Sequence, residues 1–455
     1  MQNNRKAFEG SKSTIRSIEA AIEVGLLTLV YYLIWRNGYD EGIFPAYYGY
    51  GKYVLAGVYG LLLIVLFHNF DGFKFGYLKL PDLIISQWIA LFITNFITYW
   101  QLCLIANVMI TPVPVLMLTV AGLIASFICA YGYSALYHRI YIPKDMVMIY
   151  GSKRSVSLKA KMDSRSDKYR ISKMIHVDEG YDAIVAQIVE YDAVILNDIP
   201  AQIRNDLLKF CYGKGIRTYV APKLTDIINM GATNISLFDT PLLLVRGKGL
   251  SYTQRAVKRL MDLVMASVVL VLASPVMILV AAAIKLEDGG PVFYKQKRVT
   301  RGGKVFEIYK FRSMVVDAEK DGISIPATDR DPRITRVGRF TRATRIDELP
   351  QLLNILKGEM SVVGPRPERV EHVEEYTARI PEFSYRLKVK GGLTGYAQIY
   401  GKYNTTPYDK IRLDLMYIEK YSLMLDIKLI LMTLRIMLKK ESTEGFAEEQ
   451  ESEEN

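Results

Sequence analysis

The chain has 455 residues, 50% of them hydrophobic, and 58 Lys and Arg against 47 Asp and Glu give it a formal net charge of +11. With a mean hydropathy of +0.12, this composition argues against a disordered chain and against an ordinary soluble enzyme. Three cysteines and four scattered histidines exclude a disulfide scaffold and zinc-ligand spacing. The basic excess suits anionic partners such as nucleic acid, phosphorylated substrates or a membrane surface.

The first 140 residues predict an integral membrane α-helical bundle (domain 1–140). A bilayer core is spanned by about 20 apolar residues, and the chain has four long apolar stretches at about 18–35, 53–67, 83–105 and 113–136. Residues 1–16 are mainly polar, so no cleavable signal peptide is expected. Basic residues before the first stretch, between the second and third, and after the fourth place the N-terminus and everything after Arg139 in the cytoplasm. The alternative is four buried core helices.

A fifth apolar run, 263–284, predicts a re-entrant membrane helix at about 260–285. Basic residues flank it on both sides, and Ser274-Pro275 lies in its middle. Proline removes a backbone donor and bends a helix, and a neighbouring serine can satisfy the freed backbone group in lipid. A broken helix that enters and leaves on the cytoplasmic side fits both observations. The alternative is a fifth full span, which would export the C-terminal part of the chain.

Residues 141–248 predict a small cytoplasmic α/β module of Rossmann-like type. Strands are expected at 146–150, 193–196 and 217–220, with an amphipathic helix at 199–212. Alternating strands and helices imply a parallel sheet. The turn after the first strand, at Gly151, lacks the further glycines of a dinucleotide fingerprint. A regulatory, packing or oligomerisation role is therefore favoured over a nucleotide site.

Residues 249–440 carry the candidate chemistry on an α/β-type catalytic domain. The stretch 306–314 alternates like a strand and would present Lys310 and Arg312 on one face. Arginines then recur at every third position: Arg333, Arg336, Arg339, Arg342 and Arg345. On a helix the last three would cover one cationic face. The outer arginines could contact anionic lipid, whereas those nearest the following carboxylates are better candidates for substrate phosphate.

An acidic pair, Asp347 and Glu348, follows this basic run. Pro350 suits a first helical turn and Gly358 a helix end, so the pair should lie at a helix N-terminus, where the dipole lowers carboxylate pKa values. An ionised carboxylate beside phosphate-binding arginines can attack phosphorus. A second carboxylate can hold Mg²⁺. The alternative is a pair of helix-capping acids.

A proline-rich loop favours the phosphate interpretation of the acidic pair. Pro365 and Pro367 flank Arg366 and would fix it rigidly, as bidentate phosphate recognition requires.

With these motifs in order, residues from about 255 to 438 resemble the bacterial sugar transferase family, the polyprenyl-phosphate hexose-1-phosphate transferases with one re-entrant helix. The four spans and the α/β module resemble its long subclass, which starts capsule, exopolysaccharide or O-antigen repeat units. The stretches that carry the resemblance are Lys258-Arg259-Leu260-Met261-Asp262, Ser274-Pro275, Lys310-Phe311-Arg312-Ser313-Met314, Asp347-Glu348-Leu349-Pro350-Gln351, Leu356-Lys357-Gly358-Glu359-Met360-Ser361-Val362-Val363-Gly364-Pro365-Arg366-Pro367 and Gly392-Leu393-Thr394-Gly395.

The resemblance implies a two-step exchange at the cytoplasmic face of a bacterial inner or plasma membrane. Asp347 would attack the sugar-bearing phosphate of a UDP-sugar, expel UMP and hold a phosphosugar, which undecaprenyl phosphate then takes as undecaprenyl-diphospho-sugar. UDP-glucose is the first expectation and UDP-galactose the second. Glu348 matches the position linked with Mg²⁺, and Lys310, Arg342 and Arg366 match basic positions around the nucleotide and phosphates.

Two positions depart from the family pattern. Thr300 stands where many members have glycine, and Gly391 stands where many have proline. Both departures concern local loop geometry more than the acidic pair.

The remaining expectations concern partners and the C-terminus. The lipid bilayer is an expected partner, and a homo-oligomer and polysaccharide assembly or regulatory proteins are left open. Nucleic acid is not expected, because the basic residues flank membrane segments and no recognition fold appears. A non-catalytic membrane scaffold of an assembly complex is the alternative function. Residues 408–421 and 423–439 should form amphipathic helices, and 441–455 a disordered acidic tail.

Overall fold

The computed structural model describes residues 2–39, 50–140, 143–152, 155–247, 249–316, 318, 331–401 and 405–437. The acidic tail expected at 441–455 lies outside the described residues. The chain divides into two compact units, Met1–Ala221 and Pro222–Asn455.

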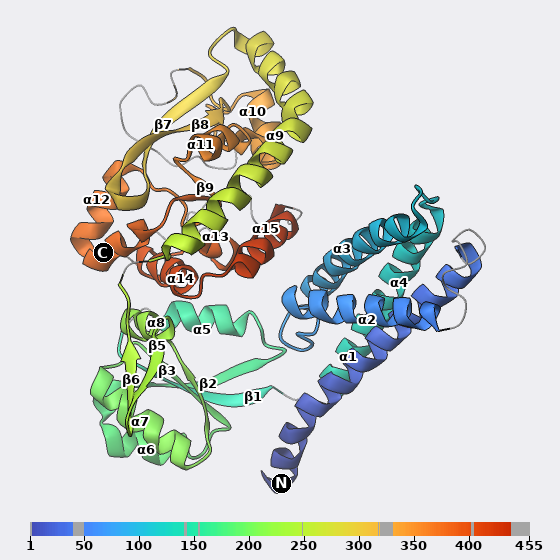
Figure 1. Ribbon diagram of the computed structural model, residues 1–455. Coiled ribbons are helices and arrows are strands. Elements are labelled where there is room, and N and C mark those ends of the chain that lie inside the picture. Colours follow the sequence, from blue (N-terminus) through green and yellow to red (C-terminus); the bar gives the residue numbers. More distant parts are fainter. Residues whose placement is uncertain are drawn as a thin grey trace. The chain divides into compact units, whose positions relative to one another are not determined.

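The apolar runs of the first unit form a four-helix bundle, as predicted (Figure 1). Its helices are α1 (Gln2–Gly38), α2 (Gly51–Asn69), α3 (Leu80–Ala106) and α4 (Val113–Ile140). All four contain segments long and apolar enough to cross a membrane. Polar groups inside the bundle bond one another: Tyr59 donates to Asn95 at 2.9 Å, and Asn95 donates to Thr119 at 2.9 Å. Hydrogen bonds of this kind between helices help to hold an apolar bundle together.

A four-stranded parallel sheet completes this unit and confirms the α/β prediction. Its strands are β1 (Lys144–Tyr150), β2 (Tyr169–His176), β3 (Ala193–Asn197) and β4 (Arg217–Val220), in the order β2-β1-β3-β4. Helices α6 (Tyr181–Ile188) and α7 (Ala201–Gly213) share an apolar cluster with one sheet face, and α5 (Ser155–Asp163) shares one with the other. Strand β2 was missed, because its sequence interleaves Arg, Ser and Lys with the apolar residues of an edge strand.

The second unit is built around α9, which is flanked by short strands and helices. It begins with α8 (Leu224–Met230) and the hairpin β5 (Thr233–Leu237) and β6 (Thr240–Leu244), followed by α9 (Tyr252–Asp288). A second antiparallel hairpin joins β7 (Phe293–Val299) to β8 (Val305–Phe311). Further on, β9 (Ser361–Val363) pairs in parallel with β10 (Gly392–Thr394).

Short helices surround these strands and close the core of the second unit. They are α10 (Arg336–Ala343), α11 (Gln351–Lys357), α12 (Val370–Arg379), the 3₁₀ segment η5 (Pro381–Lys388), α13 (Tyr396–Tyr400), α14 (Pro407–Glu419) and α15 (Leu423–Met437). The core joins α8, β8, β9, α11, α14 and α15 through residues such as Ile227, Phe306, Ile355, Val363 and Ile411. The last two helices lie where amphipathic helices were predicted.

Helix α9 contacts its own unit near both ends. In its first half Lys258 pairs with Asp426 of α15 at 2.6 Å, and Asp262 accepts from Val362 of β9 at 2.9 Å. At its other end, Glu287 accepts from the backbone N–H of Arg336 at 2.7 Å. A straight helix of 37 residues would be about 55 Å long. Figure 1 instead shows the ribbon of α9 changing direction along its length.

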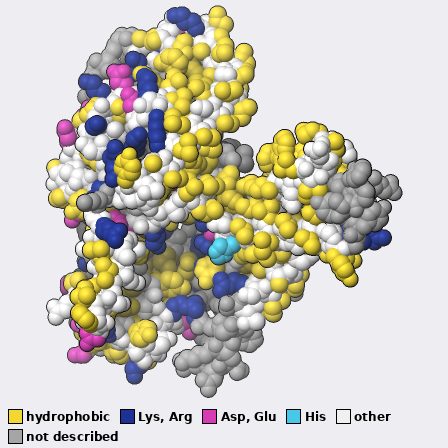
Figure 2. Space-filling model, viewed as in Figure 1, with side chains coloured by type: hydrophobic (Ala, Val, Ile, Leu, Met, Phe, Trp, Pro, Cys, Tyr) yellow, Lys and Arg dark blue, Asp and Glu magenta, His cyan; other side chains and the backbone are white. Residues whose placement is uncertain are grey.

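The middle of α9 exposes apolar side chains. Val271, Leu272, Ile278 and Leu279 are between 68% and 75% exposed. Figure 2 shows hydrophobic side chains covering this helix, with Lys and Arg side chains on the neighbouring surface. Such an apolar surface in a folded protein marks contact with lipid or with another protein.

Candidate active site

The acidic pair lies in a tight turn between α10 and α11. Asp347 and Glu348 belong to the 3₁₀ turn η4 (Ile346–Glu348), and α11 begins only at Gln351. The pair therefore precedes the helix rather than lying in its first turn. Helix α11 ends at Lys357, and Gly358 adopts φ +86°, so the predicted stop is confirmed.

Backbone geometry at Arg345 separates the last arginine from α10. Helix α10 contains Arg336, Arg339 and Arg342 and ends at Ala343, whereas Arg345 adopts φ +59°. The left-handed conformation is costly for a residue with a Cβ and reverses the chain direction. The predicted helical face shared by Arg339, Arg342 and Arg345 is therefore wrong for Arg345, whose backbone instead forms the turn that presents Asp347.

Two cations hold Glu348 from different elements. Its Oε1 accepts from the Lys310 ammonium at 2.8 Å and from the Arg366 guanidinium at 2.8 Å. Lys310 comes from β8 and Arg366 from the loop after β9. Burial would raise the pKa of Glu348, but the charges and hydrogen bonds of Arg366 and Lys310 outweigh it and hold the pKa well below its ordinary value. Glu348 is therefore ionised at neutral pH.

Asp347 lies in a different environment. It is 8% exposed, and its Oδ1 is buried with no hydrogen-bond partner among the described residues. The pKa of Asp347 is raised, mainly by burial. The positive charge of Lys310 lowers this pKa, and the negative charge of Glu348 raises it, so the net shift is upward. The expected lowering of both carboxyl pKa values is therefore wrong for Asp347. A buried carboxylate oxygen without a donor keeps its lone pairs available for a reaction.

Asn354 explains why the turn lies beside Lys310. On α11, its Oδ1 accepts from the Tyr309 backbone N–H at 3.0 Å, and its Nδ2 donates to the Glu307 carbonyl at 2.7 Å. These bonds fasten α11 to the strand that carries Lys310. Sequence reasoning missed Asn354, although an asparagine among the leucines of a short helix was a usable signal, because a buried amide needs partners.

The other predicted arginines have different partners. Arg342 donates to the Ser313 hydroxyl at 2.9 Å. Gly338 allows this close packing, because a Cβ there would stand 2.0 Å from the Ser313 carbonyl oxygen. Arg312 is buried and pairs with Asp288 at the end of α9. Lys310 and Arg366 therefore contact the acidic pair through Glu348. Arg312 instead contacts the end of α9 through Asp288.

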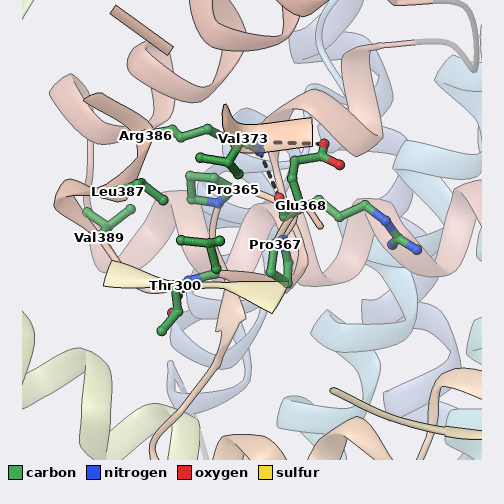
Figure 3. A pocket seen from close by; sticks show the side chains of 11 residues that line it. Thr300, Pro365, Pro367, Glu368, Val373, Arg386, Leu387 and Val389 are labelled. Carbon is green, nitrogen blue, oxygen red and sulfur yellow. Dashed lines mark hydrogen bonds and ion pairs between the residues drawn. The ribbon is translucent and has the colours of Figure 1, made fainter. Parts of the chain in front are cut away.

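The loop Pro365-Arg366-Pro367 is held by bonds to its carbonyl groups. The Pro365 carbonyl accepts from the Gly392 N–H at 2.9 Å, and the Pro367 carbonyl accepts from Arg298 at 3.1 Å. Pro365 and Pro367 also line a small pocket with Thr300, Glu368 and Arg386 (Figure 3). Besides the two prolines, these hydrogen bonds to its carbonyl groups also restrain the loop.

Thr300 and Gly391, the two positions expected to depart from the family pattern, contact each other. The Thr300 hydroxyl accepts from the Gly391 backbone N–H at 3.1 Å and donates to the Glu359 carbonyl at 3.0 Å. Proline at 391 would lack the N–H, and glycine at 300 would lack the hydroxyl. The two changes therefore form a matched pair of donor and acceptor.

Ser274 and Pro275 lie inside α9, which continues through them. Proline at 275 leaves the Val271 carbonyl without its usual donor. The Ser274 hydroxyl donates to that same carbonyl at 2.8 Å, as predicted for a serine beside a membrane proline.

The site residues also allow a test of the magnesium prediction. Among the described residues, no group of three or more His, Cys, Asp and Glu side chains forms a metal cage. Mg²⁺ usually binds one or two carboxylates together with substrate phosphate and water. Glu348 fits that smaller ligand set, because its Oε1 accepts from Lys310 and Arg366 and its second carboxylate oxygen is left for the ion.

Fold and site together define a membrane protein whose C-terminal unit carries a buried acidic pair beside cations. Residues 253–440 match the model of the family described as bacterial sugar transferase. The chain is 39% identical over 249 residues to the UDP-glucose:undecaprenyl-phosphate glucose-1-phosphate transferase of Klebsiella pneumoniae, covering 53% of this chain and 51% of the relative. It is 44% identical over 187 residues to a protein of the same name from Caulobacter vibrioides, covering 40% and 69%.

A third relative is the galactosyl transferase CpsE of Streptococcus agalactiae, 39% identical over 246 residues, with 51% of this chain and 54% of the relative covered. The chain spans about half the length of the first of these relatives. It belongs to the bacterial sugar transferase family.

Proposed function

We propose that this protein transfers hexose-1-phosphate from a UDP-sugar to undecaprenyl phosphate, releasing UMP. The observation that carries the proposal is the buried Oδ1 of Asp347, which has no hydrogen-bond partner among the described residues, next to Glu348, which binds Lys310 and Arg366. The names of the Klebsiella and Caulobacter relatives favour glucose, and that of the Streptococcus relative favours galactose next. The reaction would be the first membrane step of capsular or exopolysaccharide repeat-unit synthesis.

The chemistry proceeds in two displacements at phosphorus. An Asp347 oxygen attacks the sugar-bearing phosphate of the UDP-sugar. The bond to the bridging oxygen breaks, and UMP leaves with that oxygen. A phosphate oxygen of undecaprenyl phosphate then attacks the same phosphorus, and the bond to Asp347 breaks, which restores the carboxylate and gives undecaprenyl-diphospho-hexose. Dividing one transfer into two steps is the usual gain of a covalent intermediate.

The cations around the pair position the substrate and screen its charge. Lys310 and Arg366 hold Glu348 ionised, and their charges also act on Asp347. Arg342 and Arg345 lower the pKa of Asp347, so their charges also reach the nucleophile. Both are candidates for the phosphate contacts, together with the rigid loop at Pro365 and Pro367. Arg312, whose partner is Asp288, is assigned the weaker role of orienting the end of α9.

Glu348 is the residue that would hold Mg²⁺, together with substrate phosphate. A bound magnesium ion neutralises charge as two anions approach each other. The Oε1 of Glu348 already accepts two cationic donors, so its other carboxylate oxygen is the one left for the ion.

The membrane arrangement that suits this chemistry is a re-entrant α9. Contacts of both ends with the same unit, the Ser274-Pro275 pair and the exposed apolar middle support it. The catalytic unit would then face the cytoplasm, where UDP-sugars are soluble and the acceptor phosphate lies at the bilayer surface. Strand order β2-β1-β3-β4 supports a Rossmann-like assignment for the middle module, which we assign to regulation or assembly, including contact with a second copy or with polysaccharide-assembly proteins.

Capture of the covalent intermediate tests the proposed function. Membranes containing the protein are incubated with UDP-glucose labelled in the sugar phosphate, without acceptor, and label on the protein is mapped. We expect label at Asp347, with loss of both label and UMP release in Asp347→Asn. Glu375→Gln, at a half-exposed surface carboxylate, is the matched control and should behave as wild type. Normal turnover by Asp347→Asn would remove Asp347 as the nucleophile.

Two further measurements distinguish the alternatives. A panel of UDP-sugars with undecaprenyl phosphate identifies the sugar, and release of UMP from none of them would favour the non-catalytic scaffold. A reporter fused after Lys285 should read cytoplasmic. An external signal would instead mean that α9 crosses the membrane.

A further inference from the structure

A buried group of charges lies behind the loop that carries Arg366. The Arg386 guanidinium of η5 is 2.8 Å from Asp414 of α14 and 3.5 Å from Glu368. Glu368 also accepts from Lys410 at 2.8 Å. Arg386 and Asp414 side chains are only 3% and 1% exposed. Figure 3 shows Arg386 extending past Pro365 toward Glu368, with dashed lines to the Glu368 carboxylate and to a backbone oxygen.

That backbone oxygen belongs to Arg366. Nη2 of Arg386 donates to the Arg366 carbonyl at 2.8 Å. With the bonds already described at Pro365 and Pro367, and with the Glu368 carbonyl accepting from the Val299 N–H at 3.0 Å, four consecutive carbonyls accept donors from other elements. A loop that is neither helix nor strand is thus held at every peptide from 365 to 368.

Burying these charges is expensive, which indicates that they serve more than stability. Buried ion pairs are often no more stabilising than apolar residues of the same volume. Burial raises the pKa of Asp414 to about 6 despite Arg386 and Lys410. Burial also opposes ionisation of Glu368, but Arg386 and Lys410 lower its pKa to about 2. Arg386 therefore has an ionised partner, Glu368, at neutral pH.

We propose that Arg386, held between Asp414 and Glu368, is a positioning residue that fixes the Arg366 backbone and thereby the guanidinium that clasps Glu348. The inference rests on the proposed function, because the effect is read as sugar-phosphate transfer. Arg386 acts only through Arg366. Nη2 of Arg386 lies beside both the Asp414 carboxylate and the Arg366 carbonyl, and Nη1 faces Glu368. A lysine at 386 keeps the charge but lacks the rigid planar guanidinium that holds two nitrogens in these positions.

The test combines single and double variants in full-length protein in membranes. Arg386→Lys should lower kcat by about 10- to 100-fold, because small misplacements of catalytic groups have effects of this size, while KM for the UDP-sugar changes less. Arg412→Lys is the matched control, since Arg412 lies on α14 in a partly exposed pair with Asp409. Thermal unfolding in detergent confirms that each variant is folded.

The double variant separates positioning from a general structural role. Because Arg386 acts through Arg366, Arg366→Lys with Arg386→Lys should be no slower than Arg366→Lys alone. The proposal would be overturned if the losses of kcat in the two single variants multiplied in the double variant. It would also be overturned if Arg386→Lys were as active as Arg412→Lys. Asp414→Asn, an isosteric change to the carboxylate that pairs with Arg386, should likewise lower kcat and should not lower it further when combined with Arg366→Lys. Failure of the proposed function is distinct, because the wild-type protein itself would then release no UMP from any UDP-sugar.

Discussion

Replacing Glu368 with glutamine should destabilise the C-terminal unit by about 3 kcal/mol at neutral pH. The pKa of Glu368 falls from its ordinary 4.5 to about 2, because Arg386 and Lys410 outweigh the effect of burial. The gap between those values, at about 1.4 kcal/mol per pH unit, gives that magnitude. The side chain is only 10% exposed, so solvent screening takes little from it.

The sign of the effect fixes its pH dependence. A carboxyl whose pKa is lowered by folding stabilises the native state above its unfolded pKa, and this stabilisation is lost as pH falls through the folded pKa. The difference between wild type and Glu368→Gln should therefore be constant from pH 7 down to about pH 5. It should shrink to about 1.4 kcal/mol at pH 3.

Thermal unfolding of the detergent-solubilised protein measures this difference. For a unit of this size, about 3 kcal/mol corresponds to a Tm lower by about 6–12 °C. Glu375→Gln, at a surface carboxylate in the same unit, should leave Tm unchanged. A Glu368→Gln protein with the wild-type Tm at pH 7, or a difference that does not shrink in acid, would refute the reasoning.

Three further outcomes are expected. Asp426→Asn should lower the free energy of unfolding by about 3–5 kcal/mol, because it leaves Lys258 buried without its charged partner. In the same unfolding assay, the double variant with Leu and Met in place of Asp426 and Lys258 should restore most of the loss. Transfer activity should fall in acid at a pH above the ordinary pKa of an aspartate, because burial raises the pKa of Asp347 and only the ionised carboxylate attacks. A pH profile of label capture that stays flat to pH 4 would contradict this. Pro275→Leu should let α9 straighten, so that a fraction of a reporter fused after Lys285 becomes external; an unchanged signal would show that the proline does not control the topology.

Much of the site could be predicted because its residues are close in sequence or belong to strong local patterns. Asp347 and Glu348 are adjacent, and Arg366 is marked by its two prolines. Their convergence with Lys310 is confirmed. The four apolar helices follow from hydropathy alone, and the Ser274 bond follows from the backbone group that proline frees.

What could not be predicted depends on partners distant in sequence. Asp414 lies in a predicted amphipathic helix and Arg386 in no predicted element, and only the packing of α14 on η5 buries them together. The helical spacing of the arginines concealed the reversal at Arg345. The pKa of Asp347 was given the wrong direction because a helix N-terminus was assumed and burial cannot be read from a short motif.

Fastening both ends of α9 to one folded body has a consequence for how the protein responds to its lipids. In the proposed re-entrant arrangement α9 would meet a single leaflet, so a thicker or thinner bilayer would change how deeply the helix inserts without changing the side on which its ends lie. The reacting groups, being attached to the same body, would stay at a constant height relative to the headgroups of that leaflet. The prenyl acceptor of the proposed reaction would then present its phosphate from the side, without its tail leaving the membrane.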